Sequence, residues 1–136
     1  MKENDVQRIW HIKNYCEDIA AAIARFGNSY DVFVADTAYF NSICMCLLQI
    51  GELSGRLSSD FKDATRNRVT WGAIRAMRNM FAHEYISMDK PTIWDTAAND
   101  TPALLEFCQE IITQHPDEFE PFDPLPEEDE SHGMTM

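Results

Sequence analysis

Apolar residues recur at three- and four-residue steps along most of the chain, the spacing of one face of an α-helix. The pattern predicts a first helix over residues 5–26, with Asn4 or Asp5 as its N-cap and Gly27 as its end. Residues 28–31 are expected to connect it to a second, long helix over residues 36–57. This second helix is apolar nearly all round between residues 43 and 50, as expected for the central helix of a bundle.

Two further helices are predicted in the second half of the chain. Residues 58–68 form a polar, basic connector, with or without a short helical turn, and Thr70 caps a third helix. After a loop at residues 86–90, Pro91 begins a fourth helix in its first turn, where the missing N–H does no harm. A kink or break is expected at residues 100–102, because the residue before a proline is disfavoured in a helix. With no strand pattern and no repeat, the predicted fold is all-α, an antiparallel bundle of four to five helices.

Length and composition place the chain among single-domain globular proteins. It has 136 residues, 45% of them hydrophobic and 25% charged, which is enough to bury an ordinary core. The bundle is predicted to occupy residues 1–116. Residues 117–136 combine prolines with acidic residues and are expected to form a disordered tail, since they cannot bury enough apolar surface to offset the entropy of ordering.

The cysteines and the apolar segments both indicate a cytoplasmic protein. The four cysteines lack zinc or redox spacing and are predicted to be reduced and mostly buried. The apolar runs are far too short to cross a bilayer, and no signal peptide opens the chain. No membrane partner is therefore expected.

The net charge of −12 is concentrated in the tail, where eight acidic residues stand without a Lys or Arg, so that the body carries −4. Within the body, basic side chains cluster near the middle of the chain: Arg56, Lys62, Arg66, Arg68, Arg75 and Arg78. A local basic surface able to meet nucleic acid is therefore compatible with the acidic total.

We call residues 76–89, AMRNMFAHEYISMD, the reactive stretch, because they contain the side chains best suited to chemistry. Arg78 offers a rigid fork of donors for a phosphate, and His83 can exchange a proton near neutral pH. This pair suits cleavage of RNA by its own 2′-hydroxyl, with the imidazole as base and without metal or cofactor. A lone histidine is more often a helix cap or a satisfied core residue. A tyrosine at a helix end, such as Tyr85, more often packs than reacts.

Helix geometry limits how one copy of this stretch can form a site. On an unbroken helix, Arg78 and His83 point about 140° apart, whereas Asn79 shares a face with His83 and Tyr85 shares one with Arg78. Either a loosened helix end at residues 82–83 or two copies facing each other across a dimer axis would bring the groups together.

The second helix contains a glycine followed by an acidic residue. Gly51 costs about 1 kcal/mol against alanine in a helix, so a close contact between helices is predicted there. For Glu52 two options stay open: a surface ion pair with Arg56, or a contact near the reactive stretch.

The run WGAIRAMRNMFAHEY, with Arg-x4-His-x-Tyr at Arg78, His83 and Tyr85, resembles the HepT-like branch of the HEPN families. Residues 49–52 and Trp94 fit the same likeness, which covers the chain from its first helix to about residue 115. The resemblance implies a helical homodimer with the two motifs facing each other across a cleft. It also implies a metal-independent endoribonuclease that is the toxin of a type VII-like toxin–antitoxin pair.

The resemblance further implies a partner, an MNT-type nucleotidyltransferase that acts as antitoxin and transfers AMP from ATP onto Tyr85. The added negative charge beside Arg78 would silence RNA binding. Arg78 and His83 would be catalytic, with Asn79 supporting them. Further supporting candidates are Glu52, Arg75 and Glu84.

Glu84 departs from the family pattern, since many relatives have a small residue there, and a carboxylate beside His83 could either stabilise the imidazolium or repel RNA. Together with the −4 body, Glu84 favours the alternative function, a non-catalytic HEPN module that binds a nucleotidyltransferase partner, RNA or nucleotide.

Overall fold

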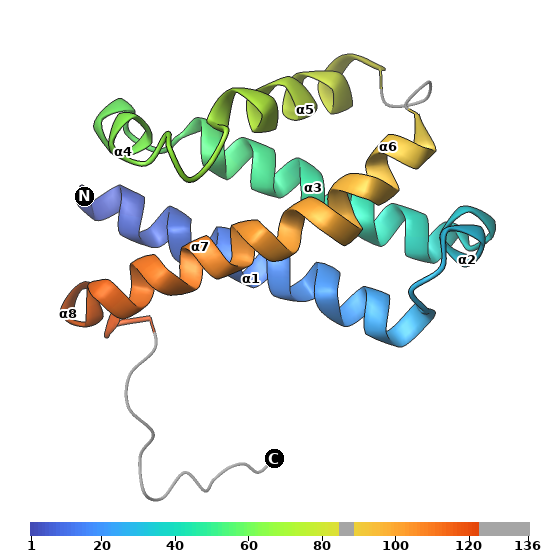
Figure 1. Cartoon of the computed structure of the whole chain (residues 1–136), viewed down its shortest axis with the longest axis horizontal. Helices are drawn as coiled ribbons and strands as arrows, with labels where there is room; N and C mark the ends of the chain where they lie inside the picture. The colour runs from blue at the N-terminus through green and yellow to red at the C-terminus, as the bar shows by residue number, and fades with distance from the viewer. Residues whose placement is uncertain (85–88, 123–136) are drawn as a thin grey trace, which may run out of the picture.

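The computed structural model describes residues 1–84 and 89–122, apart from the side chains of His83 and Glu84, and every regular element in that part of the chain is helical (Figure 1). The all-α prediction is confirmed. The elements in order are α1 (Glu3–Phe26), α2 (Tyr30–Ala35), α3 (Thr37–Gly55), α4 (Ser59–Ala64), α5 (Trp71–Glu84), α6 (Lys90–Asp95), the π-helical η2 (Thr96–Asp100), α7 (Thr101–Gln114) and α8 (Pro116–Phe119).

The long helices form an antiparallel bundle in which α1 packs against both α3 and α7. In Figure 1, α1 and α5 run in one direction, and α3 and the continuous α6–η2–α7 rod run in the other. The helix α5 lies on the outer side of α3, which is its main contact in the described part of the chain. The reactive stretch is therefore carried by a peripheral helix that is held mainly from one side.

Two aromatic clusters fill the ends of the core. At one end the Phe33 ring lies 5.4 Å from the Tyr39 ring and 5.1 Å from the Trp94 ring, centroid to centroid. At the other end the Trp71 and Phe107 rings meet edge to face with centroids 6.0 Å apart. Such aromatic contacts contribute beyond the area that they bury.

Polar side chains cap the starts of α2, α3 and α4. Asp36 accepts a hydrogen bond from the Tyr39 amide at 3.1 Å, and Ser58 accepts one from the Phe61 amide at 3.2 Å. Gly27 ends α1 with a φ of +119°, a conformation that favours glycine. The observed C-terminal end of α1 and start of α3 are thus close to the predicted ones.

The prediction of Asn4 or Asp5 as the N-cap of α1 was wrong, because the helix begins at Glu3 after Lys2. Asp5 lies inside the first turn and is 1% exposed. Its carboxylate accepts hydrogen bonds from the Ser58 hydroxyl at 2.6 Å and the Ser58 amide at 2.8 Å. Asp5 therefore fastens the start of α1 to the start of α4. The expected connector over residues 28–31 was also too long, since α2 begins at Tyr30.

The fourth predicted helix is a rod without an interruption. Lys90 and Pro91 occupy the first turn of α6, as expected for proline. At the predicted kink the backbone widens into the π-helical η2, and the Thr101 hydroxyl donates to the Ala97 carbonyl at 2.6 Å. A wide turn accommodates the Pro102 ring, which would clash with the carbonyl four residues earlier in a regular helix.

Packing continues past residue 116, where sequence analysis ended the bundle. Phe119 on α8 is 2% exposed, and the Phe122 ring lies 6.1 Å from the Trp10 ring, centroid to centroid. Residues 123–136, the remainder of the predicted tail, lie outside the described residues, so their disorder stays a prediction. Among the described helices, none combines the length and apolar character needed to span a membrane.

The four cysteines are free and buried, as predicted. Burial raises the pKa of Cys16 to about 12, so its thiol is not ionised at neutral pH.

Candidate active site

The helix α5 carries most of the reactive stretch and is held on the bundle by the apolar side chains of its inner face. Trp71 and Phe81 are buried and Ile74 is half-buried, at the three- and four-residue steps predicted for this helix. The Ala73 and Ile74 amides donate to the Thr70 carbonyl at 3.0 and 3.4 Å, so the helix starts where the sequence predicted. The remaining faces of α5 carry the polar side chains.

Arg78 is seated directly on α3 through Gly51. A Cβ added to Gly51 would lie only 2.6 Å from the Cβ of Arg78, well inside normal contact distance. The close helix–helix contact predicted at Gly51 is therefore confirmed, and its partner is the arginine of the motif. Only glycine allows the two backbones to approach so closely at this point.

The guanidinium of Arg78 is held by Glu52. Its Nε donates to Glu52 Oε2 at 2.9 Å, and one terminal nitrogen donates to Asn79 Oδ1 at 3.3 Å. The Arg78 and Glu52 side chains keep 39% and 33% of their surface exposed, so the pair stands at the solvent boundary. Of the two options for Glu52, the structure shows the contact near the reactive stretch.

The other predicted site residues occupy the last turns of α5. The helix continues without a break through His83 to Glu84, which removes the option of a loosened end at residues 82–83. Arg78 and His83 are therefore about 140° apart around the helix axis. The side chains of His83 and Glu84, and all of Tyr85, lie outside the described residues.

The basic cluster is partly neutralised. Arg68 pairs with Glu110 at 2.7 Å on the surface, and Arg78 pairs with Glu52. Arg66 and Arg75 are exposed, and neither has an ion pair to any residue that the structure describes. Arg75 precedes Arg78 by one turn of α5 and extends its cationic surface.

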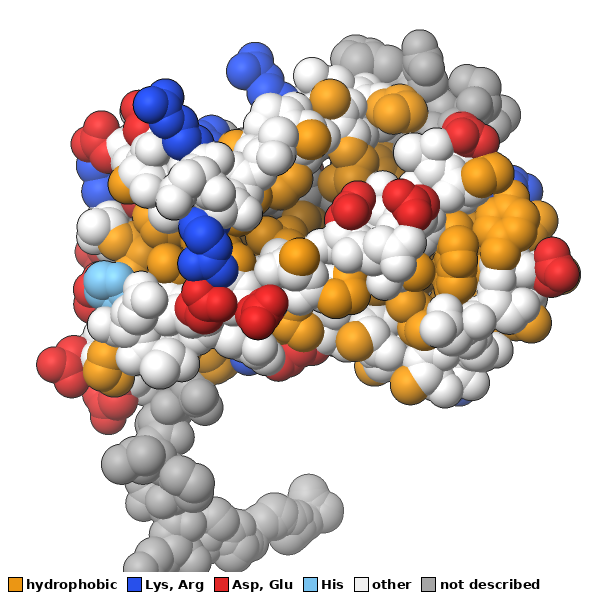
Figure 2. All heavy atoms as spheres, in the orientation of Figure 1, with side chains coloured by type: hydrophobic (Ala, Val, Ile, Leu, Met, Phe, Trp, Pro, Cys, Tyr) orange, Lys and Arg blue, Asp and Glu red, His pale blue; other side chains and the backbone are white. Residues whose placement is uncertain are grey.

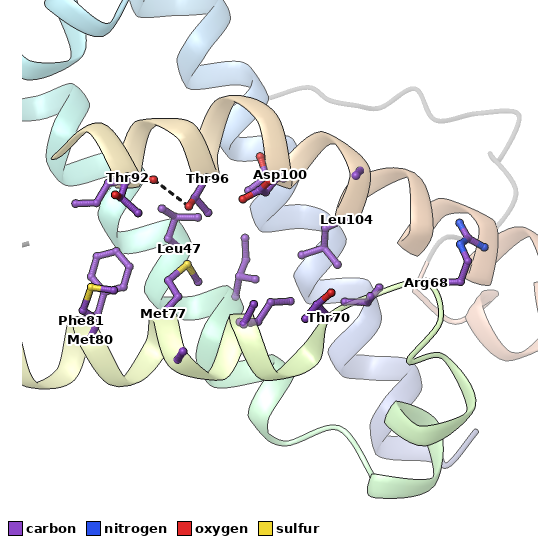
Figure 3. A pocket seen from close by; sticks show the side chains of 18 residues that line it. Leu47, Arg68, Thr70, Met77, Met80, Phe81, Thr92, Thr96, Asp100 and Leu104 are labelled. Carbon is purple, nitrogen blue, oxygen red and sulfur yellow. Dashed lines mark hydrogen bonds between the residues drawn. The ribbon is translucent and has the colours of Figure 1, made fainter. Parts of the chain in front are cut away.

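A groove that sequence reasoning did not predict runs along the inner face of α5, beside Ile74 and Phe81. It has a volume of about 600 Å³ and lies between α5 and the α6–η2–α7 rod, with Leu47 and Ile50 of α3 at its base (Figure 3). Figure 2 shows apolar side chains lining this hollow. Met77 and Met80 point into it from α5, and Thr92 and Thr96 lie on the rod side. Met80 lies one turn after Met77, so it widens the apolar inner face of α5 and was the sequence signal for the groove.

The groove is distinct from the surroundings of Arg78, which is not one of its lining residues. Its acidic member is Asp100, whose pKa is raised by burial and by the neighbouring Asp95 carboxylate. Elsewhere, the residues that the structure describes contain no group of three or more His, Cys, Asp and Glu side chains placed to hold a metal ion.

Residues 12–111 match the family described as "Ribonuclease HepT-like". Two similar proteins of Methanocaldococcus jannaschii are "Putative RNase MJ1216" and "Putative RNase MJ0125", each 24% identical to this chain over 113 residues. The alignments cover 82% of this chain and 91% and 95% of the two relatives, respectively. No solved structure is significantly similar to the chain.

Proposed function

The chain belongs to the HepT-like ribonuclease family, and from this premise we propose that it is a metal-independent endoribonuclease whose site combines Arg78, Asn79 and His83. It acts as the toxin of a toxin–antitoxin pair. The main observation in favour of the proposal is the way in which Arg78 is held on the surface. One edge of its guanidinium is anchored to Glu52, while the side chain remains 39% exposed and able to meet a phosphate.

The proposed reaction uses the RNA's own nucleophile. The His83 imidazole takes the proton of a 2′-hydroxyl, and the 2′-oxygen attacks the adjacent phosphorus. The 5′-oxygen of the next nucleotide leaves and takes up a proton from solvent, so the products are a 2′,3′-cyclic phosphate and a 5′-hydroxyl. Arg78 stabilises the charge on the pentavalent phosphate, where a preorganised donor contributes most.

We place this site across a homodimer. The unbroken course of α5 supports the arrangement, because it turns Arg78 and His83 of one chain about 140° apart. A two-fold axis beside α5 would bring Arg78 of one copy toward His83 of the other.

Mixing inactive variants tests the shared site. Arg78→Ala and His83→Ala dimers, unfolded together and refolded at equal amounts, should regain about a quarter of wild-type activity. Half of the dimers are then mixed, and each mixed dimer holds one intact site of two. Activity that stays at the level of the separate variants would place both groups of a site on one chain.

Tyr85 is the proposed switch. A nucleotidyltransferase partner transfers AMP from ATP to its phenol oxygen with release of pyrophosphate, adding a phosphodiester charge beside the motif. Co-expression with an MNT-type nucleotidyltransferase, followed by intact-mass measurement, should show AMP-sized increments on the wild type and none on Tyr85→Phe. Increments that persist in Tyr85→Phe would move the modification to another residue.

The ribonuclease assay uses end-labelled RNA in EDTA. His83→Ala should lower cleavage by about 10²–10⁴-fold, the range of a general base. The control is His115→Ala, which removes a histidine that pairs with Glu118 at 3.0 Å, near the start of α8. Equal cleavage by wild type and His83→Ala would refute the role of His83.

A second candidate function is a non-catalytic module that binds RNA, nucleotide or the nucleotidyltransferase. The Glu52 carboxylate on Arg78 favours it, because an arginine that is already paired binds a phosphate less strongly. Wild-type protein that binds RNA but leaves it intact under every condition would decide for this candidate.

A further inference from the structure

Two adjacent residues of α3, Gly51 and Glu52, lie against Arg78 from outside its own helix. Gly51 brings the backbone of α3 up to the Cβ of Arg78, and Glu52 holds the Nε at the other end of the side chain. The arginine side chain is thus held both at its Cβ and at its guanidinium group. Neither contact involves the groove, whose lining contains neither Gly51 nor Glu52.

The side on which Glu52 holds the guanidinium matters for phosphate binding. Glu52 occupies the Nε edge and Asn79 contacts one terminal nitrogen, while the second terminal nitrogen has no partner among the described residues. A phosphate is gripped by two parallel donors of this planar fork. Anchoring by Nε fixes the direction of the second terminal nitrogen, and a phosphate that displaces Asn79 would meet both terminal nitrogens, whereas an unanchored arginine samples many rotamers.

We propose that Glu52 is a positioning residue that aims Arg78 at the phosphate of the RNA, with Gly51 setting the distance. The inference rests on the proposed function for its substrate. It assigns Glu52 a role through Arg78 rather than direct contact with RNA. The negative charge of Glu52 is tolerated beside the phosphate site because solvent screens it. The Arg78 and Glu52 side chains are 39% and 33% exposed.

The rival account makes Glu52 a restraint that merely weakens the charge of Arg78. The two accounts predict opposite results for two substitutions. Glu52→Gln keeps a side-chain oxygen that accepts from Nε but removes the charge, and Glu52→Ala removes both. Positioning predicts that glutamine rescues what alanine loses. Restraint predicts that both variants cleave or bind RNA better than the wild type.

The main experiment measures kcat and KM of RNA cleavage. Glu52→Ala should lower kcat by about 10–100-fold with KM changed less than about threefold, since misdirection by about 1 Å acts on the transition state. Glu52→Gln should stay within about threefold of the wild type. Glu110→Ala is the matched control, because it removes the carboxylate of another surface arginine pair, Arg68–Glu110 at 2.7 Å. It should leave both constants unchanged.

A double-mutant cycle separates positioning from a general structural effect. In the Arg78→Ala background, adding Glu52→Ala should cause no further loss, because the group that Glu52 positions is already gone. Additive losses, or variants of Glu52 that are faster than the wild type, would overturn the proposal.

A second readout keeps the test independent of ribonuclease activity. The Nε–Hε signal of Arg78 in a ¹⁵N NMR spectrum should be resolved in the wild type and Glu52→Gln and be lost or averaged in Glu52→Ala. Binding of a 2′-O-methyl RNA oligonucleotide, which cannot be cleaved, should weaken in Arg78→Ala but change less than about threefold in Glu52→Ala, in line with the small change in KM.

The two readouts distinguish the two possible failures. A wild type that binds this oligonucleotide through Arg78 but does not cleave RNA would end the proposed activity and leave the positioning role standing. Binding that is insensitive to Arg78→Ala, or that tightens in Glu52→Ala, would end the positioning role.

Discussion

Replacing Gly51 with alanine is expected to force α3 and α5 apart at the seat of Arg78. The new Cβ would lie 2.6 Å from the Arg78 Cβ and 3.3 Å from its Cα, whereas ordinary contact begins at 3.4 Å. Neither Arg78 atom can swing away by a change of rotamer, so the helices must separate by about 0.8 Å, the difference between 2.6 and 3.4 Å. Overpacking of this kind costs about 1–3 kcal/mol of the free energy of unfolding.

Gly55 supplies a matched control on the same helix. It is the last residue of α3, and a Cβ added there meets nothing within 4 Å. Each substitution replaces a helical glycine and gains up to about 1 kcal/mol of helix propensity. The difference between Gly51→Ala and Gly55→Ala therefore isolates the contact with Arg78.

We expect Gly51→Ala to be about 1–3 kcal/mol less stable than Gly55→Ala, a difference of about 3–10 °C in Tm for a domain of this size. Urea denaturation and calorimetry measure it. Ribonuclease activity should fall in Gly51→Ala below the unfolding temperature and stay unchanged in Gly55→Ala. Equal stabilities of the two variants would refute the close packing of α5 on α3 and the contact between Gly51 and Arg78.

Three further predictions concern the core. Burial raises the pKa of Asp5, but the hydrogen bonds from Ser58 and Lys2 together lower it below its ordinary value. Their stabilisation is therefore complete above the ordinary carboxyl pKa and is lost as pH falls through the lowered value. Ser58→Ala should cost about 1–3 kcal/mol at pH 7 and less at pH 2 by urea titration, and an equal loss at both would contradict this. Phe33→Ala should lower the free energy of unfolding by about 3–5 kcal/mol, whereas replacing the 39% exposed Val32 with alanine should lower it by less than about 0.5 kcal/mol. Thermal melts compare the two variants, and similar losses would count against the aromatic cluster around Phe33. Because burial raises the pKa of Cys16 to about 12, its thiol should react with a disulfide reagent at pH 8 only after unfolding; rapid labelling of the native protein would contradict its burial.

Local rules accounted for most of the helix boundaries. The start of α3 near Asp36, the end of α1 at Gly27 and the place of Pro91 in the first turn of α6 were all predicted, because each depends on backbone groups within a few residues. Asp5 was misassigned for the opposite reason. Its carboxylate is satisfied by Ser58, 53 residues away in the sequence, and no local pattern reports such a partner.

The residue types of the candidate site were proposed from the sequence, whereas the pairing of Arg78 was not predictable from it. The spacing of Arg78 and His83 was the basis for proposing residues 76–89 as the candidate site, and Gly51 predicted a close helix contact. Which helix would meet Gly51, and whether Glu52 would turn to Arg56 or elsewhere, depended on the packing of α5 against α3. A carboxylate on a helix surface has several cations within reach, and only the relative placement of two helices selects one.

The sequence by itself determined the helical class, most of the helix ends and the group of residues that can act on a phosphate, because periodicity, capping and side-chain chemistry are local properties. Only the tertiary structure decided that Arg78 packs on Gly51 with its Nε on Glu52, that a groove opens between α5 and the α6–η2–α7 rod, and that the chain stays packed as far as Phe119. These features arise from contacts between segments distant in the chain, whose geometry is set by how whole helix surfaces fit together.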